Sequence, residues 1–306
     1  MQQKQKGSKD MNKLITDKDT NMVFFSKYLN RSSRESICNT LNYFKIKWAI
    51  LPYTKDFWAR DYMPIQVSKN QLIKYTYNPD YLQEDSKYIT DSTNCCKELH
   101  QTTLPTNIIL DGGNVIKCTN SVIMTDKIFK ENPHKKHAQL INELETLFQA
   151  ELVLIPRDKD EKYGHADGMV RYIDNNRVLI NNYWNFDKTL RTKLLHALSN
   201  KFEVVELHYD VKKSSNYSWA YINFLLVDNV MFVPCLGKEE DSQALEQLKG
   251  LYCVNQAQVN VRNLVAQGGA LNCISWNVKA NDGMLKYYTA CQQLNNANTD
   301  SIHFES

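Results

Sequence analysis

Hydrophobic positions repeat at helical spacing in several stretches of the chain. The repeat is clearest where residues three or four positions apart are apolar, as in Leu140, Ile141, Leu144, Leu147 and Phe148. The same spacing predicts five helices, over residues 32–45, 84–100, 134–149, 187–200 and 241–252.

Short hydrophobic runs, typical of buried strands, separate these helices. The most obvious runs cover residues 152–155, 178–180, 202–207, 224–227, 230–233 and 259–265. Many helices are followed by a strand, then a short polar or glycine-containing motif, then another strand. This order predicts a mixed α/β protein.

Polar motifs recur along the chain at a nearly constant interval. Their central residues are Asp61, Asp111, His165, Asn223 and Cys273, at intervals of 50, 54, 58 and 50 residues. A fixed period of this size indicates a repeat architecture. Five units closed around an axis would bring one loop from each to a common centre. Chance spacing in a doubly wound α/β domain is the alternative, and the period alone does not exclude it.

Composition places the chain among ordinary globular proteins. It has 306 residues, 42% hydrophobic and 23% charged, with a net charge of +3. No basic face is evident, so we expect no nucleic-acid partner. No run approaches the ~18 apolar residues that span a bilayer, and residues 1–12 lack the apolar core of a secretory signal. We expect a cytoplasmic protein with no membrane partner, a disordered tail over 1–12 and one domain over 13–306.

One cysteine and one histidine stand out by their neighbours. Cys273 is one of eight cysteines, none of them in a C-x-x-C pair. It follows Gly268 and Gly269 closely, and such glycines let a substrate approach the main chain. His165 is the best acid–base candidate among seven histidines, and an extended segment would place Asp167 on its side. The alternative for Cys273 is a buried structural cysteine, and the alternative for His165 is an ordinary surface turn.

Two further motifs contribute carboxylates. Asp61 follows Trp58, which could stack on a planar cation or pack along an alkyl chain, and Asp111 begins an Asp-Gly-Gly-Asn sequence. For Asp61 the alternative is a surface pair with Arg60 beside a core tryptophan. For the Asp111 motif it is a plain loop. Carboxylates around a cysteine and a histidine, without metal-ligand spacing, suit a guanidinium, whose N–H groups bind carboxylates while its carbon stays open to sulfur. We expect neither a metal nor a cofactor.

The chain resembles the agmatine deiminase and bacterial-type peptidylarginine deiminase family, within the guanidino-group-modifying superfamily. The resemblance rests on FWARDYMP (57–64), LDGGNV (110–115), GHADGMVR (164–171), YINFLLVDNVMFVP (221–234) and GGALNC (268–273), in the family's order. It implies a pentein-type α/β propeller, with fivefold pseudo-symmetric ββαβ modules around a central active site.

The resemblance also implies the catalytic roles. Cys273 would be the nucleophile and form a covalent thiouronium intermediate. His165 would protonate the departing ammonia and then activate water, while Asp111 would support the histidine. Two positions depart from the family: many agmatine deiminases have Glu in place of Asp111 and His in place of Asn272.

The remaining residues carried over are implied to bind the substrate. Asp61 and Asp167 would hold the guanidinium nitrogens, Trp58 and Asn223 would line the pocket, and the Gly269 backbone would help to position the nucleophile. The expected substrate is agmatine, hydrolysed to N-carbamoylputrescine and ammonia. Deimination of arginine residues in peptides and a non-catalytic binding module are the alternatives, and a homo-oligomer is compatible with either.

Overall fold

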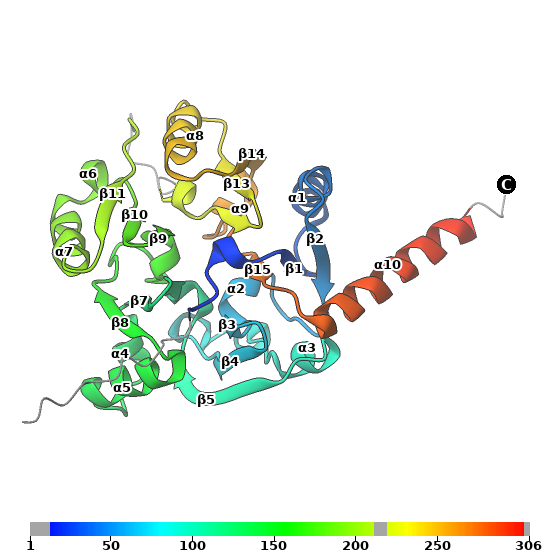
Figure 1. The fold of residues 1–306 in the computed structure, drawn as a ribbon, viewed down its shortest axis with the longest axis horizontal. Coiled ribbons are helices and arrows are strands. Elements are labelled where there is room, and N and C mark those ends of the chain that lie inside the picture. Colours follow the sequence, from blue (N-terminus) through cyan, green and yellow to red (C-terminus); the bar gives the residue numbers. More distant parts are fainter. Residues whose placement is uncertain (1–12, 211–218, 303–306) are drawn as a thin grey trace, which may run out of the picture.

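The computed structural model describes residues 13–210 and 219–302, so the tail expected over 1–12 lies outside the described residues. Within these ranges the strands form five sheets of three strands each. Figure 1 shows the sheets arranged around a common centre. Sheet by sheet, the strands are β15 (Ser275–Val278), β1 (Met22–Ser26) and β2 (Lys47–Leu51); β3 (Ile65–Ser68), β4 (Gln71–Thr76) and β5 (Thr103–Ile109); β6 (Ile116–Lys117), β7 (Ser121–Thr125) and β8 (Glu151–Ile155); β9 (Val170–Asp174), β10 (Arg177–Ile180) and β11 (Glu203–Glu206); β12 (Leu225–Val227), β13 (Val230–Cys235) and β14 (Asn255–Asn260).

All five sheets have the same internal order. The first and middle strands are antiparallel, and the third strand is parallel to the middle one. Parallel neighbours need a crossover connection, which helices supply here. The crossover helices are α1 (Arg31–Tyr43), α3 (Thr93–Glu98), α4 (Lys127–Glu131) with α5 (His137–Phe148), α6 (Tyr183–Phe186) with α7 (Lys188–Leu198), and α8 (Glu240–Leu251). The predicted propeller of ββαβ modules is therefore confirmed.

The ring is closed by strands from the two ends of the described chain. β1 pairs antiparallel with β15, from Met22 opposite Val278 to Phe25 opposite Ser275. Both ends of the propeller thus belong to one sheet, so closure depends on backbone hydrogen bonds across that sheet. After β15, the helix α10 (Asp282–Ile302) extends away from the propeller, in red in Figure 1.

Strand β1 is covered on both faces. Met22 and Phe24 belong to one hydrophobic cluster, whereas Val23 and Phe25 belong to another. Successive side chains of a strand point to opposite faces, so a strand buried on both faces is continuously hydrophobic. β1 is a continuous apolar run of the same kind as β12 and β13, but the hydrophobic pattern did not single it out.

Four of the five predicted helices are confirmed, as α1, α5, α7 and α8. The helix predicted over 84–100 is wrong, because only the 3-10 helix η3 (Ser86–Tyr88) and the short α3 form there. The carboxylate of Asp91 accepts hydrogen bonds from the Thr93 amide at 3.0 Å and the Thr93 hydroxyl at 2.7 Å. Such local bonds favour a turn over a continuous helix.

The strand predicted over 259–265 is also wrong, whereas the other five predicted strands are confirmed as β8, β10, β11, β12 and β13. β14 ends at Asn260, and the last residues of the apolar run form the helix α9 (Arg262–Val265). The Asn260 side chain accepts a hydrogen bond from the Arg262 amide at 3.2 Å. This bond turns the chain out of the sheet.

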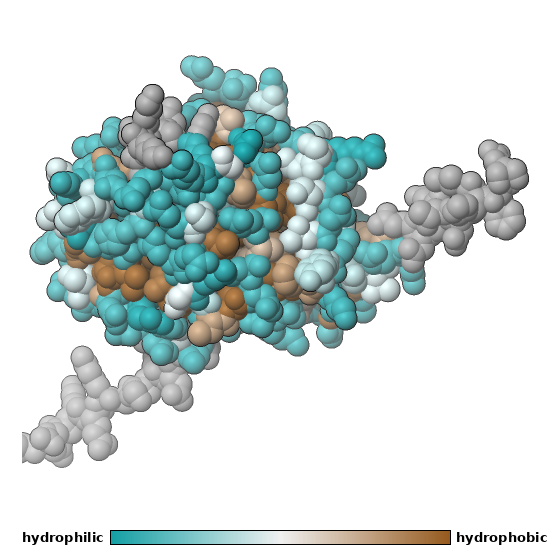
Figure 2. Space-filling view, turned by 90° about the horizontal axis from the view of Figure 1, so that it is seen from above, coloured by the Kyte–Doolittle hydropathy of each residue, from teal (hydrophilic) through white to brown (hydrophobic). Residues whose placement is uncertain are grey.

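The surface seen in Figure 2 is largely hydrophilic, with hydrophobic areas between the polar ones. Among residues 13–210 and 219–302, no helix has the length and apolar content required to cross a membrane.

Candidate active site

Each predicted site residue lies in a connection between consecutive modules. Asp61 is in α2 (Ala59–Tyr62), between β2 and β3, and Asp111 directly precedes η4 (Gly112–Asn114). His165 directly precedes η5 (Ala166–Gly168), Asn223 directly follows η6 (Ala220–Ile222), and Cys273 lies between α9 and β15. The same place in each module therefore supplies one motif, which accounts for the period in the sequence.

Three of these connections, those with Asp61, His165 and Cys273, line a cavity of about 80 Å³. Four of the predicted site residues line it: Trp58, Asp61, His165 and Cys273. The other lining residues are Asp56, Tyr81, Leu82, Lys162, Tyr163 and Gly268. The remaining predicted residues, Asp111, Asp167, Asn223 and Gly269, are buried beside this wall and contact the residues that form it.

His165 lies between two buried carboxylates. Its Nε2 is 2.8 Å from Asp111 Oδ2, and its Nδ1 is 3.6 Å from Asp61 Oδ1. Burial acts to lower the pKa of His165, but the negative charges of Asp61 and Asp111 raise it to about 10. The imidazole is therefore protonated at neutral pH, with Nε2 held by Asp111 and Nδ1 towards Asp61.

The two carboxylates themselves differ in pKa. Burial, opposed by His165, raises the pKa of Asp61 to about 7. Burial also acts to raise the pKa of Asp111, but the cations Lys127 and His165 hold it below its usual value. Near neutral pH, Asp61 is poised between its two protonation states, whereas Asp111 is ionised.

Gly113 explains the glycine pair of the Asp-Gly-Gly-Asn motif. Its amide donates a hydrogen bond to Asp61 Oδ1 at 3.1 Å. A Cβ atom at this position would lie 2.7 Å from both Asp61 Oδ1 and His165 Nδ1. Only a glycine therefore fits between the carboxylate and the imidazole.

The Cys273 thiol is held by polar groups on two sides. Its Sγ lies 3.3 Å from Asn223 Oδ1 and 3.6 Å from Asp167 Oδ2, and its backbone amide also donates to Asn223 Oδ1 at 3.3 Å. Burial, with the charges of Asp167 and Asp61, raises the pKa of the thiol well above its usual value. The thiol is therefore protonated until a positive charge enters the site.

Asn272 connects the loop that carries Cys273 to two charged residues. Its Nδ2 donates to Asp167 Oδ2 at 2.6 Å, and its Oδ1 accepts from Arg60 at 3.0 Å. Arg60 also contacts the Asn277 side chain, so the alternative of an Arg60–Asp61 surface pair is wrong. A side-chain amide offers both a donor and an acceptor, which suits this position between a carboxylate and a guanidinium.

Trp58 packs directly against the glycine pair that precedes Cys273. A Cβ atom on Gly269 would lie 2.0 Å from the Trp58 ring, and one on Gly268 would lie 2.8 Å from Tyr163. Gly268 also has a positive φ of 96°, which favours glycine. The two glycines therefore let both aromatic rings lie close to the main chain at the cavity.

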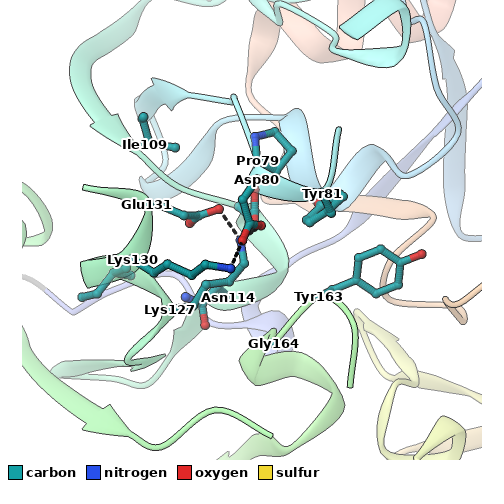
Figure 3. Close-up of polar contacts among 12 residues, drawn as sticks. Pro79, Asp80, Tyr81, Ile109, Asn114, Lys127, Lys130, Glu131, Tyr163 and Gly164 are labelled. Carbon is teal, nitrogen blue, oxygen red and sulfur yellow. Dashed lines mark hydrogen bonds and ion pairs between the residues drawn. The ribbon is translucent and has the colours of Figure 1, made fainter. Parts of the chain in front are cut away.

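Sequence reasoning missed the charged residues behind Asp111. Lys127 is buried and contacts Asp111 Oδ2 and Glu131 Oε1, and its Nζ is 3.7 Å from Asp80. Asp80 also pairs with Lys130 at 2.6 Å (Figure 3). Burial and the charge of Asp111 raise the pKa of Glu131 to about 8. Lys127 and Glu131 are four residues apart on a helix, a spacing typical of exposed ion pairs, so no signal in the sequence marked them as buried.

No group of three or more His, Cys, Asp or Glu within 13–210 and 219–302 has an arrangement suited to holding a metal ion.

Comparison with known proteins gives both a family and a fold. The family model described as Porphyromonas-type peptidyl-arginine deiminase matches residues 3–278. A protein of Mycoplasma capricolum, provisionally named an agmatine deiminase, is 22% identical over 210 residues, or 56% of this chain. The chain therefore matches only 57% of the length of this relative.

Two solved structures show the fold more completely. The agmatine deiminase of Enterococcus faecalis has a TM-score of 0.72 at 16% identity, over 88% of this chain and 96% of its own. A C. jejuni agmatine deiminase in which a cysteine is replaced by serine, with substrate bound, has a TM-score of 0.68 at 16% identity, over the same shares of the two chains. At these identities the likeness concerns the fold.

Proposed function

The chain belongs to the Porphyromonas-type peptidyl-arginine deiminase family, and we propose that it is a guanidine deiminase that uses Cys273 as its nucleophile. The observation that carries this proposal is one cavity lined by Cys273, His165 and Asp61, with Asp167 Oδ2 3.6 Å from the sulfur. The C. jejuni relative, solved with substrate bound after replacement of a cysteine by serine, supports a cysteine in this role.

Asp61 and Asp167 bind the guanidinium group. Each has one oxygen that accepts hydrogen bonds within the described residues, Asp61 Oδ1 and Asp167 Oδ2. The other oxygen of each accepts none there, so it is open to the N–H groups of a substrate. A guanidinium presents such donors in a planar fork, and the Trp58 ring at the cavity wall offers it a flat surface.

Substrate binding starts the first step. The guanidinium charge lowers the pKa of the Cys273 thiol, which loses its proton to solvent. The thiolate then adds to the guanidinium carbon, and His165 donates a proton from Nδ1 to one amino group. The carbon–nitrogen bond breaks and ammonia leaves, so that a positively charged thiouronium remains on Cys273 and His165 becomes neutral.

Hydrolysis of the thiouronium completes the reaction. Neutral His165 takes a proton from water as the hydroxide adds to the carbon. The carbon–sulfur bond then breaks, the added hydroxyl becomes a carbonyl, and its proton returns to the Cys273 sulfur. A ureido product leaves, and His165 is protonated as it was at the start. A histidine positioned for such proton transfers contributes roughly 10²–10⁴-fold to a rate.

The cavity favours agmatine over a peptidyl arginine. The volume of about 80 Å³ does not separate the two, because both present the same slender guanidinium-bearing chain, so the choice rests on the charges of the wall. Asp56 also lines the cavity, and among the described residues no lysine or arginine pairs with it. An unpaired carboxylate favours a substrate whose far end is cationic, as the ammonium of agmatine is. Lys162, on the same wall, would instead attract a carboxylate, which is the reason to test free arginine beside agmatine.

A substrate panel tests the proposal. Release of ammonia and of the ureido product is measured with agmatine, free arginine and an arginine peptide, for the wild type and for Cys273→Ser. We expect turnover of agmatine by the wild type and none by the variant, with an unchanged circular dichroism spectrum. Turnover of the peptide alone would favour the peptidylarginine deiminase, and undiminished activity of Cys273→Ser would overturn the nucleophile.

A further inference from the structure

Lys127 is a buried cation that the steps above do not use. It is the first residue of α4, and its side chain is only 3% exposed. Its amino group contacts the carboxylates of Asp111 and Glu131 and lies 3.7 Å from Asp80. Burying a lysine among carboxylates costs desolvation energy, and a buried ion pair is often no more stable than apolar residues of the same size. Stability alone is therefore a weak reason for this lysine.

Lys127 and His165 share a single oxygen of Asp111. The Lys127 amino group donates to Asp111 Oδ2, the same atom that lies 2.8 Å from His165 Nε2. The other oxygen, Asp111 Oδ1, is buried and has no hydrogen-bond partner among the described residues. Lys127 and His165 therefore both contact Oδ2, whereas Oδ1 has no hydrogen-bond partner among the described residues. A change at Lys127 consequently alters the negative charge that Oδ2 presents to the imidazolium.

This sharing has a chemical consequence for the histidine. A carboxylate that faces only an imidazolium stabilises the charged form and makes the proton harder to release. A lysine on the same oxygen takes part of that negative charge, and its own positive charge disfavours the imidazolium. In the proposed reaction His165 gives up a proton in each turnover. Because Asp111 shares its negative charge between Lys127 and His165, it stabilises the imidazolium less and the proton is easier to release.

Resting on the proposed role of His165 as the acid, we infer that Lys127 is a positioning residue, which fixes Asp111 against His165 and divides its negative charge so that the imidazolium can release its proton to the leaving group. The titratable groups facing Lys127 are Asp80, Asp111, Glu131 and His165. Those facing His165 are Asp61, Asp111, Lys127, Glu131 and Glu161.

Nearby aromatic side chains complete the surroundings of both groups. The Lys127 amino group lies 5.3 Å from the Tyr81 ring centroid, and the Tyr81 and His165 rings are 6.0 Å apart. Tyr163 is also 6.0 Å from His165. Tyr81 and Tyr163, to the right of Lys127 in Figure 3, both line the cavity.

The test replaces Lys127 by methionine, which keeps the length of the side chain and removes its charge. The titration midpoint of His165, followed by NMR in protein labelled at histidine, is expected to rise by about one pH unit. With agmatine, kcat is expected to fall by about tenfold, while KM changes little because no substrate contact is lost. The alkaline limb of the pH profile moves in the same direction as the midpoint.

Lys130→Met is the matched control. Lys130 is on the same helix, also pairs with Asp80, and its side chain is 59% exposed. Lys130→Met removes one positive charge, as Lys127→Met does, but Lys130 does not contact Asp111. The titration midpoint of His165 and the kcat of Lys130→Met should therefore match those of the wild type. Equal effects of the two variants would mean that general electrostatics acts on His165, which would overturn the role of Lys127.

A second variant guards against a folding defect. Lys127→Gln retains a hydrogen-bond donor towards Asp111 but no charge, and it should raise the His165 midpoint in the same direction as the methionine. An unchanged midpoint in either folded variant overturns the inference. The NMR titration requires no substrate, so it remains decisive even if the protein hydrolyses none of the guanidines tested and the proposed function fails.

Discussion

Asp61 and Asp111 lie on opposite sides of one imidazole, yet they behave as different groups. Both are buried, and both face a nitrogen of His165. The pKa of Asp61 is raised to about 7 by burial, whereas that of Asp111 is held below its usual value by Lys127 and His165 against the effect of burial. The protein therefore supplies Asp111 with a permanent second cation and leaves Asp61 without one.

The difference indicates where a substrate cation is needed. The position opposite Asp111 is occupied by a lysine, but the corresponding position beside Asp61 is the cavity itself. A buried carboxylate without a full counter-charge is costly, and a bound guanidinium would remove that cost. The unbalanced carboxylate is thus the one that we propose binds substrate, and the balanced carboxylate is the one that supports the histidine.

The largest effect is expected from Asp111→Asn. This change removes the anion that holds both His165 and Lys127, so kcat should fall by roughly 10²–10⁴-fold. It also leaves Lys127 with less counter-charge in a buried place, and loss of one partner of a buried ion pair costs about 3–5 kcal/mol. Turnover of agmatine and thermal unfolding measured on the same sample check both parts.

The double variant Asp111→Asn with Lys127→Met provides the control for stability. Removing both charges should recover much of the lost unfolding free energy, because no unpaired cation remains. Turnover should stay low in the double variant. If the single variant kept more than half of the wild-type kcat, Asp111 could not support the acid.

The contrast between these carboxylates was only half visible in the sequence. The period of the motifs, together with the family resemblance, predicted that Asp61, Asp111, His165 and Cys273 meet; three of them line one cavity, and Asp111 lies behind His165. The sequence could not reveal Lys127, because burial of a lysine depends on how α4 packs against β7 and the neighbouring module. Likewise, Asn272 became intelligible only once Arg60 and Asp167 were seen on either side of it.

The helices and strands were likewise predicted only in part from the sequence. Amphipathic helices such as α5 were predicted well, since one apolar face against a sheet leaves a clear spacing. Among the strands buried almost throughout, β12 and β13 were predicted from their apolar runs, whereas the equally buried β1 and β7 were not. The errors at 84–100 and 259–265 arose where the side chains of Asp91 and Asn260 bind nearby backbone amides and redirect the chain.

A smaller effect, of a different kind, is expected from Asp61→Asn. A charged hydrogen bond to the guanidinium is lost, and such bonds contribute about 1.5–3 kcal/mol. We therefore expect kcat/KM for agmatine to fall roughly 10- to 100-fold, mainly through KM. A loss confined to kcat would contradict the assignment of Asp61 to substrate binding.

The pH profile of the same variant sharpens the comparison. In the wild type, kcat/KM should rise through about pH 7 as Asp61 ionises and fall through about pH 10 as His165 loses its proton. Asp61→Asn should lack the acid limb. Its alkaline limb should move to lower pH, because the negative charge of Asp61, which helps to raise the pKa of His165, is lost. An acid limb retained near pH 7 would assign that limb to another group.

Glu131→Gln should have the smallest effect on turnover. The pKa of Glu131 is raised to about 8, so at pH 7 the carboxyl is largely protonated and glutamine has nearly its shape. We expect less than about a twofold change in kcat at pH 7.

The same variant changes how stability depends on pH. Because the pKa of Glu131 in the folded state lies above the unfolded value, wild-type stability falls as pH rises towards and through 8, and glutamine removes this loss. Melting temperatures at pH 5 and pH 8.5 should therefore show the variant gaining on the wild type at the higher pH. If the variant instead lost stability relative to the wild type at pH 8.5, ionised Glu131 would be a needed partner of Lys127, and Asp111 would no longer be its principal counter-charge.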